Sequence, residues 1–176
     1  MIGLILKRTP LMATLTYLAL PPLTFTISPG SLTLLSCSFT NAVPPTIRQG
    51  KRETAVTVTG CRCVGCSVTG SDGSSGGGMS IDLYTAPEST VSDLYFEDCT
   101  STQFGGGLLL QLFVHSIRLL ITFISLTDCS ADQKGGGLTI SSIDVPFSLT
   151  DCEFIRCQVT SSDSLNGMGS GLFTGF

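Results

Sequence analysis

The chain has 176 residues, of which 42% are hydrophobic and only 12% are charged, and its formal net charge at pH 7 is -4. Disordered chains combine low hydrophobicity with high net charge, so this composition excludes a disordered tail and fits one domain that buries a core. Nucleic acids are bound by clustered Lys and Arg, and the sequence has no basic stripe. We therefore expect no nucleic-acid partner.

Residues 1–30 allow two interpretations. Lys7 and Arg8 precede an apolar run from Leu11 to Leu20, and this order resembles a signal peptide, although no small-residue cleavage site follows it. We expect this segment to be either a signal or anchor, through which the protein would associate with a membrane, or an irregular N-terminal coil of the repeat described next. Residues 31–176 are predicted to hold the repeats.

Clusters of glycine recur through the C-terminal part of the chain. Their last glycines are 29, 30 and 34 residues apart, and a fixed period of about 20 to 50 residues is typical of repeat architectures. After each cluster, apolar residues alternate with others, as at Leu108, Leu110 and Leu112, which predicts a strand with one apolar face. The clusters comprise Gly76, Gly77 and Gly78; Gly105, Gly106 and Gly107; Gly135, Gly136 and Gly137; and a relaxed copy with Gly169 and Gly171.

A second marker keeps the same period. Segments with an apolar residue three positions before a cysteine end at Cys99, Cys129 and Cys157, and weaker copies end at Cys37 and Cys66. From Cys37 to Cys157 the successive separations are 29, 33, 30 and 28 residues. Five coils are counted from these cysteines, so the evidence for the repeat does not depend on the glycine clusters alone.

The register of the last repeat has two alternatives. Residues 154–157 fit the apolar-x-x-Cys form, but residues 149–152 copy residues 126–129 more closely. The two alignments differ by five residues.

Together these markers predict an all-β fold, a right-handed parallel β-helix with about 30 residues per coil and roughly five coils. Helical repeats are excluded at the clusters, since each glycine inside a helix costs about 1 kcal/mol relative to alanine. Stacked strands lie about 4.8 Å apart, so Leu108 should lie over Leu138 and Cys99 over Cys129. The glycines are expected to supply φ > 0 at a corner where a Cβ would clash with the neighbouring coils.

These residues resemble the repeats of polymorphic outer membrane proteins, within the broader pectin-lyase-like class of right-handed β-helices. That family pairs Phe-x-x-Asn with Gly-Gly-Ala-Ile-like segments. Here residues 96–99 have Cys in place of Asn, and residues 105–108 read Gly-Gly-Gly-Leu. The resemblance covers about residues 34–173, is best over 76–172, and weakens at 43–45, where no glycine cluster occurs. It implies surface exposure and adhesion.

The eight cysteines have three interpretations. We favour buried, unreactive ladder residues that take the place of the stacked Asn. Disulfides between coils are the second, because a spacing of about 4.8 Å lies within the permitted Cα range, although parallel side chains are poorly oriented for a bridge. A zinc or cluster site at Cys61, Cys63 and Cys66 is the third, and it has no evident fourth ligand. We expect neither a metal nor a cofactor.

The carboxylates and the single histidine suggest little chemistry. Asp98, Asp128 and Asp151 each precede a cysteine, and the first two could stack as the carboxylate pair that a glycan-active enzyme needs. We favour solvated polar residues, since no Arg or Lys recurs with them. His115 has no evident partners for a triad or a metal site. Residues 108–126, which contain it, are interpreted as strands and not as a membrane helix, because they include an arginine.

Three functional hypotheses remain. The favoured one is a noncatalytic, adhesin-like structural or interaction module, exposed on a cell surface or in a secretory compartment, whose flat faces bind a protein or a glycan. The second is a glycan-active enzyme of the pectin-lyase-like class. The third is a fragment of a longer repeat protein without independent function, since the last repeat breaks off after Phe173. We expect no enzymatic activity.

Overall fold

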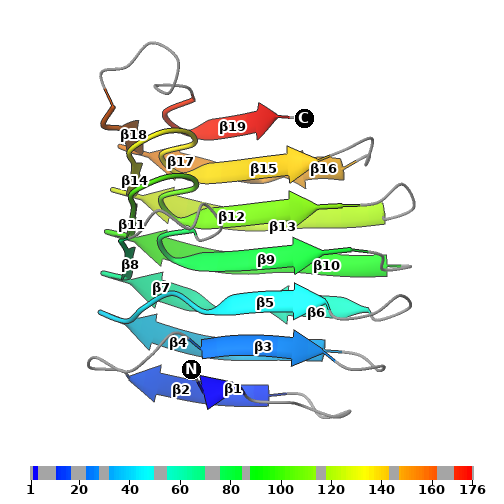
Figure 1. The fold of residues 1–176 in the computed structure, drawn as a ribbon. Coiled ribbons are helices and arrows are strands. Elements are labelled where there is room, and N and C mark those ends of the chain that lie inside the picture. Colours follow the sequence, from blue (N-terminus) through cyan, green and yellow to red (C-terminus); the bar gives the residue numbers. More distant parts are fainter. Residues whose placement is uncertain are drawn as a thin grey trace.

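The chain folds as a stack of parallel β-coils (Figure 1). Every regular element of the described residues is a strand, and each pairs in parallel with its equivalents in neighbouring coils. The front strands run from left to right in Figure 1, the rear strands return, and successive coils climb, so the winding is right-handed. The computed structural model describes residues 2–3, 11–16, 23–27, 32–49, 55–69, 76–84, 88–113, 118–142, 147–161 and 169–175.

This architecture confirms the predicted all-β parallel β-helix with coils about 30 residues apart. Three coils contain the complete pattern, an unbroken triple glycine followed by strands of all three sheets, whereas roughly five were predicted. The outer coils stack on these three but have other corners, such as Pro44 and Pro45 before the third strand of the front sheet. Within the described residues, no helix is long and apolar enough to cross a membrane.

Sheet A forms the front of the stack in Figure 1 and comprises seven of the described strands. Its inward side chains form columns along the axis: Met79, Leu108 and Leu138 occupy equivalent positions and are each 0% exposed. The strands, in spatial order, are β1 (Ile2–Gly3), β3 (Leu23–Ile27), β5 (Thr46–Gln49), β9 (Met79–Leu83), β12 (Leu108–Leu112), β15 (Leu138–Ser142) and β19 (Leu172–Gly175).

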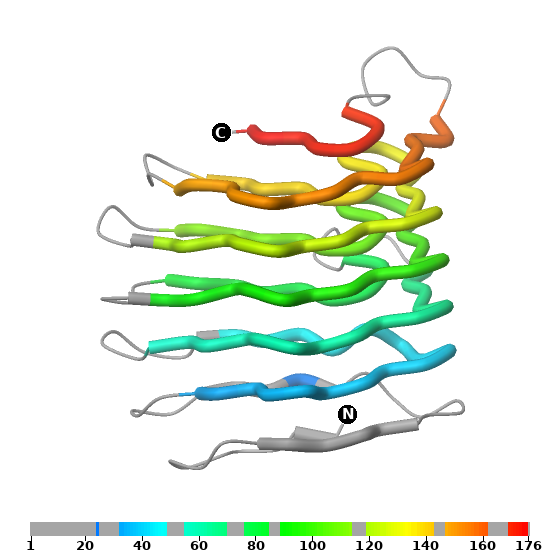
Figure 2. Tube along the Cα trace, turned by 180° about the vertical axis from the view of Figure 1, so that it is seen from behind, coloured from blue at the N-terminus to red at the C-terminus, as the bar shows by residue number. Residues whose placement is uncertain are grey.

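Sheets B and C form the rear and one side of the stack, as Figure 2 shows from behind. In sheet B, two short strands replace one long strand in the coils that contain β6 and β16. Its strands are β2 (Leu11–Thr16), β4 (Leu32–Thr40), β6 (Val56–Thr59), β7 (Arg62–Val64), β10 (Glu88–Glu97), β13 (Arg118–Thr127), β16 (Phe147–Thr150) and β17 (Glu153–Ile155). Sheet C consists of β8 (Ser67–Val68), β11 (Thr100–Ser101), β14 (Ser130–Ala131) and β18 (Gln158–Val159).

The core is a set of apolar columns between the sheets. Val58, Val91 and Ile121 lie one above another in sheet B and are 0% exposed, because alternate residues of each strand point inward. Each such side chain contributes about 1.5–3 kcal/mol by leaving water. In the last coil the equivalent residue, Leu149, is only partly buried. The core is therefore continuous through the middle coils and less enclosed at that end.

The register of the last coil follows the apolar-x-x-Cys alignment. Phe154 pairs with Leu126, and Leu149 pairs with Ile121 five positions earlier. The similarity between residues 149–152 and 126–129 is therefore not a structural equivalence.

Left-handed backbone conformations also recur in columns. Asn and Asp adopt φ > 0 more readily than other non-glycine residues, which explains why they share these positions with glycine. Ser36, Phe123 and Arg156 are the exceptions, at φ 53°, 55° and 50°. One column bends sheet B and consists of Ser36, Gly60, Asp93, Phe123 and Asp151; the other turns the chain from sheet B to sheet C and consists of Asn41, Gly65, Asp98, Asp128 and Arg156.

The glycine clusters stack at the corner between sheets C and A. Backbone hydrogen bonds join them from coil to coil, as from Gly107 N to the Gly137 oxygen at 2.8 Å. The expected φ > 0 occurs at the first glycine of a cluster, Gly105, but not at the middle one, Gly106. Gly106 is required for space, because a Cβ there would overlap the carbonyl oxygen of Gly136 and lie 2.5 Å from backbone atoms of Ser130.

Gly106→Ala should therefore lower the free energy of unfolding by about 1–3 kcal/mol through overpacking against the next coil. Chemical denaturation followed by far-UV circular dichroism measures this change. Ser148→Ala, at an exposed position on the outside of sheet B, is the control and should change stability by less than about 0.5 kcal/mol. Equal stability of Gly106→Ala and the wild type would show that the coils do not approach closely at this corner.

Candidate functional site

The outer face of sheet A carries two columns of side chains between the inward ones. The first contains Ser80, Leu109 and Thr139, all of which are buried although they point away from the core. The second contains Arg48, Asp82, Gln111 and Ser141, one from each of four successive coils. Strand alternation fixes both columns, since Ile81 and Leu110 lie between them and point inward.

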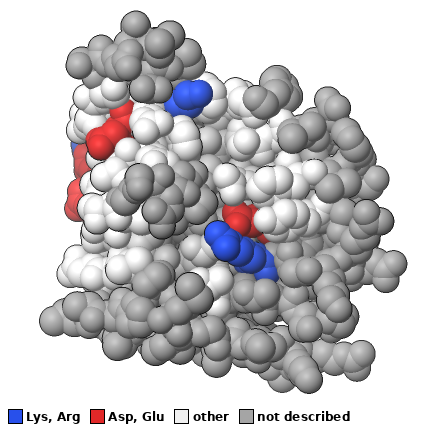
Figure 3. Space-filling view, in the orientation of Figure 1, with Lys and Arg blue, Asp and Glu red and all other residues white. Residues whose placement is uncertain are grey.

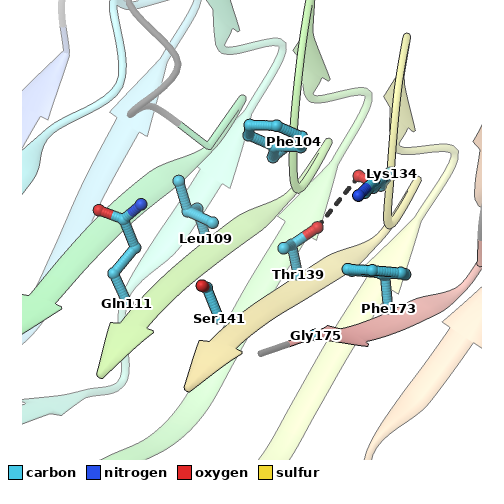
Figure 4. Close-up of a pocket in the computed structure, with 8 residues that line it drawn as sticks. All are labelled: Phe104, Leu109, Gln111, Lys134, Thr139, Ser141, Phe173 and Gly175. Carbon is cyan, nitrogen blue, oxygen red and sulfur yellow. Dashed lines mark hydrogen bonds between the residues drawn. The ribbon is translucent and has the colours of Figure 1, made fainter. Parts of the chain in front are cut away.

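A hollow of about 160 Å³ opens on this face, over β12, β15 and β19 (Figure 4). Phe104 and Lys134 reach it from equivalent turn positions just before two glycine clusters, where they form an isolated bridge. The Lys134 ammonium lies 4.9 Å from the centre of the Phe173 ring, a cation–π contact. The residues that line the hollow are Phe104, Leu109, Gln111, Lys134, Thr139, Ser141, Phe173 and Gly175.

The chemistry of the hollow is that of a small binding site. Two phenylalanine rings and Leu109 supply apolar walls, while the Gln111 amide and the Ser141 hydroxyl face the same space (Figure 4). Thr139 is already engaged, because its hydroxyl donates to the Lys134 carbonyl oxygen at 3.0 Å. Sites that enclose a drug-sized ligand usually measure about 300–1,000 Å³, so this hollow fits a single ring-sized group.

A second aromatic feature lies where β9 and β12 end. The rings of Tyr84 and Phe113 stack with centroids 4.5 Å apart and an angle of 9° between their planes. The two side chains are 41% and 39% exposed. They occupy equivalent positions in consecutive coils, and Phe113 N donates to the Leu83 oxygen there.

An ion pair joins β5 to β9 in the second outer column. Arg48 Nε donates to Asp82 Oδ2 at 3.0 Å, and the Asp82 side chain is only 3% exposed, against 47% for Arg48. The second carboxylate oxygen, Oδ1, is buried and accepts no hydrogen bond. Burial raises the pKa of Asp82 above its ordinary value, although Arg48 acts in the opposite direction. Figure 3 shows that charged side chains on the described part of this face are few.

Acidification should reveal the energetic cost of burying the Asp82 carboxylate. Because the folded-state pKa of Asp82 is raised, its contribution favours folding at low pH and is lost as pH rises through that pKa. The unfolding free energy of the wild type should therefore rise relative to Asp82→Asn as pH falls from neutrality, in denaturant titrations at several pH values.

Asp128→Asn is the matched control with the opposite sign. Hydrogen bonds from Arg156 lower the pKa of Asp128, so its contribution is present at neutral pH and lost on acidification. The same pH trend in both comparisons would contradict this assignment of the two carboxyl groups.

The three aspartates that precede cysteines do not form one stack. Asp98 and Asp128 lie in the same column, but Asp151 belongs to the bend inside sheet B, in line with Asp93. No Arg or Lys recurs with all three, but Arg156 takes the next position in the column after Asp128 and binds it with Nε and Nη2 at 2.6 and 2.5 Å. The sequence conceals this pair because Arg156 occupies a position where Asp recurs. His115 lies outside the described residues.

Four cysteines form a column in the core. Cys66, Cys99, Cys129 and Cys157 occupy equivalent positions, since each precedes paired strands of sheet C. The prediction that Cys37 belongs to this column is wrong, because Ala42 fills that position. Ser67 N donates to the Ala42 oxygen, just as Thr100 N donates to the Cys66 oxygen.

Cys37 instead lies over Cys61 in a neighbouring column, and Cys152 ends the same column. The coil from Phe39 to its equivalent, Cys63, spans only 24 residues, whereas the next spans 33. The separation of 29 residues between Cys37 and Cys66 thus matches the mean period by coincidence.

All eight cysteines are thiols, and six of them are buried; Cys152 and Cys157 are partly buried. The Cys99 thiol lies 3.4 Å from the Glu97 oxygen and 3.5 Å from the Cys63 oxygen, to which it can donate. Burial raises the pKa of Cys63, and contacts with Cys129 and Cys66 raise that of Cys99. Among the described residues, no three or more His, Cys, Asp or Glu side chains converge as ligands of a metal ion.

These observations define the chain as a parallel β-helix with a hollow of about 160 Å³ on sheet A and a column of thiols in its core. No family model matches the chain, and no curated protein or solved structure matches it. Sequence patterns missed Phe104, Lys134 and Phe173, which line the hollow. Alignment of the coils contains a signal for the first two, since both lie directly before a triple glycine.

Proposed function

We propose that the chain is a noncatalytic, adhesin-like β-helix module, exposed on a cell surface or in a secretory compartment, and that the outer face of sheet A binds a glycan. The hollow between Phe104, Gln111 and Phe173 is the observation that carries this proposal. The likeness of the repeats to those of polymorphic outer membrane proteins, in the pectin-lyase-like class, supports the adhesive role as an analogy of fold.

The lining of the hollow favours a sugar ring over other small ligands. Aromatic faces pack against the apolar side of such a ring, while amide and hydroxyl groups pair with its hydroxyls. Gln111 and Ser141 lie one coil apart on the same outer column, so a saccharide lying along the axis would meet one polar group per coil. The exposed Tyr84 and Phe113 rings offer a further apolar surface beside this column.

The disposition of carboxylates supports a noncatalytic role. Glycoside hydrolysis uses two carboxyl groups on opposite sides of the scissile bond, one of them as a proton donor. Asp82 is engaged by Arg48 and buried, Asp128 is engaged by Arg156, and neither lines the hollow. A pectin-lyase-like enzyme would need a side chain at the hollow that gives or takes a proton. Lys134 lies there, but its ammonium group contacts the Phe173 ring.

Phe173→Ala should weaken glycan binding at least tenfold, because it removes an aromatic wall of the hollow, and a tenfold loss corresponds to about 1.4 kcal/mol. Isothermal titration calorimetry with oligosaccharides selected on a glycan array measures the affinity. Phe123→Ala is the matched control, since that ring is 57% exposed on sheet B, outside the hollow, and its loss should leave affinity unchanged.

Failure of the wild type to bind any glycan on the array would overturn the proposed function. Equal losses of affinity in the two phenylalanine variants would show that the glycan does not bind in the hollow. Release of new reducing ends or unsaturated products from a polyuronide, in the presence of calcium, would contradict the noncatalytic assignment.

A further inference from the structure

The column of four thiols has a fixed spacing. The residue after each cysteine donates to the carbonyl oxygen of the equivalent cysteine one coil earlier: Thr100 N to the Cys66 oxygen at 3.0 Å, Ser130 N to the Cys99 oxygen at 2.9 Å, and Gln158 N to the Cys129 oxygen at 3.0 Å. These bonds hold neighbouring strands at the usual separation of about 4.8 Å. Equivalent side chains on such strands start from Cβ atoms at nearly the same distance.

That spacing decides between two kinds of link. A disulfide needs sulfurs about 2.05 Å apart on Cβ atoms about 3.5–4.5 Å apart, so it would have to pull two coils together against their hydrogen bonds. An ion held between two thiolates, with metal–sulfur bonds of about 2.3 Å as in zinc–cysteine sites, places the sulfurs about 4.6 Å apart. The spacing of the strands therefore suits a linear sulfur–metal–sulfur link better than a disulfide.

The ligand set limits the identity of the ion. Structural zinc takes four ligands, and no three or more suitable side chains converge among the described residues. Cu(I) is selected by soft sulfur ligands, and as a closed-shell monovalent ion it accepts two of them in a line. Cys157, which is only partly buried, ends the column.

We infer that the pairs Cys66 with Cys99 and Cys129 with Cys157 each bind one Cu(I) ion between their sulfurs. Two S–H bonds break at each site, two S–Cu bonds form, two protons leave to solvent, and copper remains Cu(I). Cys37 over Cys61 is a third stacked pair of the same kind. This function differs from the expectation that the thiols are unreactive, and it does not depend on glycan binding.

Two double variants test the pairing because each removes two thiols. Cys66→Ala/Cys129→Ala leaves no adjacent pair in the column, whereas Cys66→Ala/Cys99→Ala keeps Cys129 next to Cys157. Alanine suits the position, since Ala42 occupies it in the neighbouring coil at 5% exposure. Cu(I) is supplied without oxygen as its acetonitrile complex, and retained copper is counted by native mass spectrometry and by competition with a Cu(I) chelator.

Relative to the wild type, the alternate variant should lose two copper equivalents and the adjacent variant one. Equal losses, or no copper retained by the folded wild type, would overturn the inference. X-ray absorption of the copper-loaded wild type provides a readout that needs no variant. The spectrum should show two sulfur ligands only, and nitrogen, oxygen or a third sulfur bound to copper would contradict the proposed site. A mass lower by two hydrogens per pair, measured by native mass spectrometry, would show that a disulfide forms instead and would also contradict it.

Discussion

The structure depends on hydrogen bonds that run along the axis and join each coil to the next in register. Because parallel strands are held about 4.8 Å apart, every residue has an equivalent directly above and below it. A side chain must therefore suit its own position and also stack on its counterpart. Columns of like residues, from Val58 to Ile121 in the core and from Gly77 to Gly136 at the corner, follow from this constraint.

The same constraint distributes strain and charge. Left-handed conformations recur where the chain bends, and they are filled by Gly, Asn and Asp in most coils. Where Arg156 interrupts the aspartate column, stacking brings it against Asp128 and makes an ion pair between coils. Where Asp82 stacks on Arg48, the neighbours above and below leave one carboxylate oxygen without a partner. Charged residues thus meet mainly along the axis.

The regular part of this fold could be predicted from the sequence because glycine clusters and period-2 alternation are local signals with a physical cause. The register of Cys37 could not, because coil length varies with the loops while strand pairing does not, so a separation near the mean period placed it five positions away from its true equivalent. The hollow on sheet A also had no local signal: Phe173 meets Lys134 only after one coil has closed on the next.

In-register stacking can be measured directly by NMR, from scalar couplings across hydrogen bonds between backbone amide nitrogens and carbonyl carbons. Couplings should join Ser130 to Cys99, Gln158 to Cys129 and Gly107 to Gly137, as the hydrogen bonds of the structure require. Couplings from these amides to carbonyls one or more residues away, or to residues within the same coil, would contradict the account and with it the columns on which both proposed sites depend.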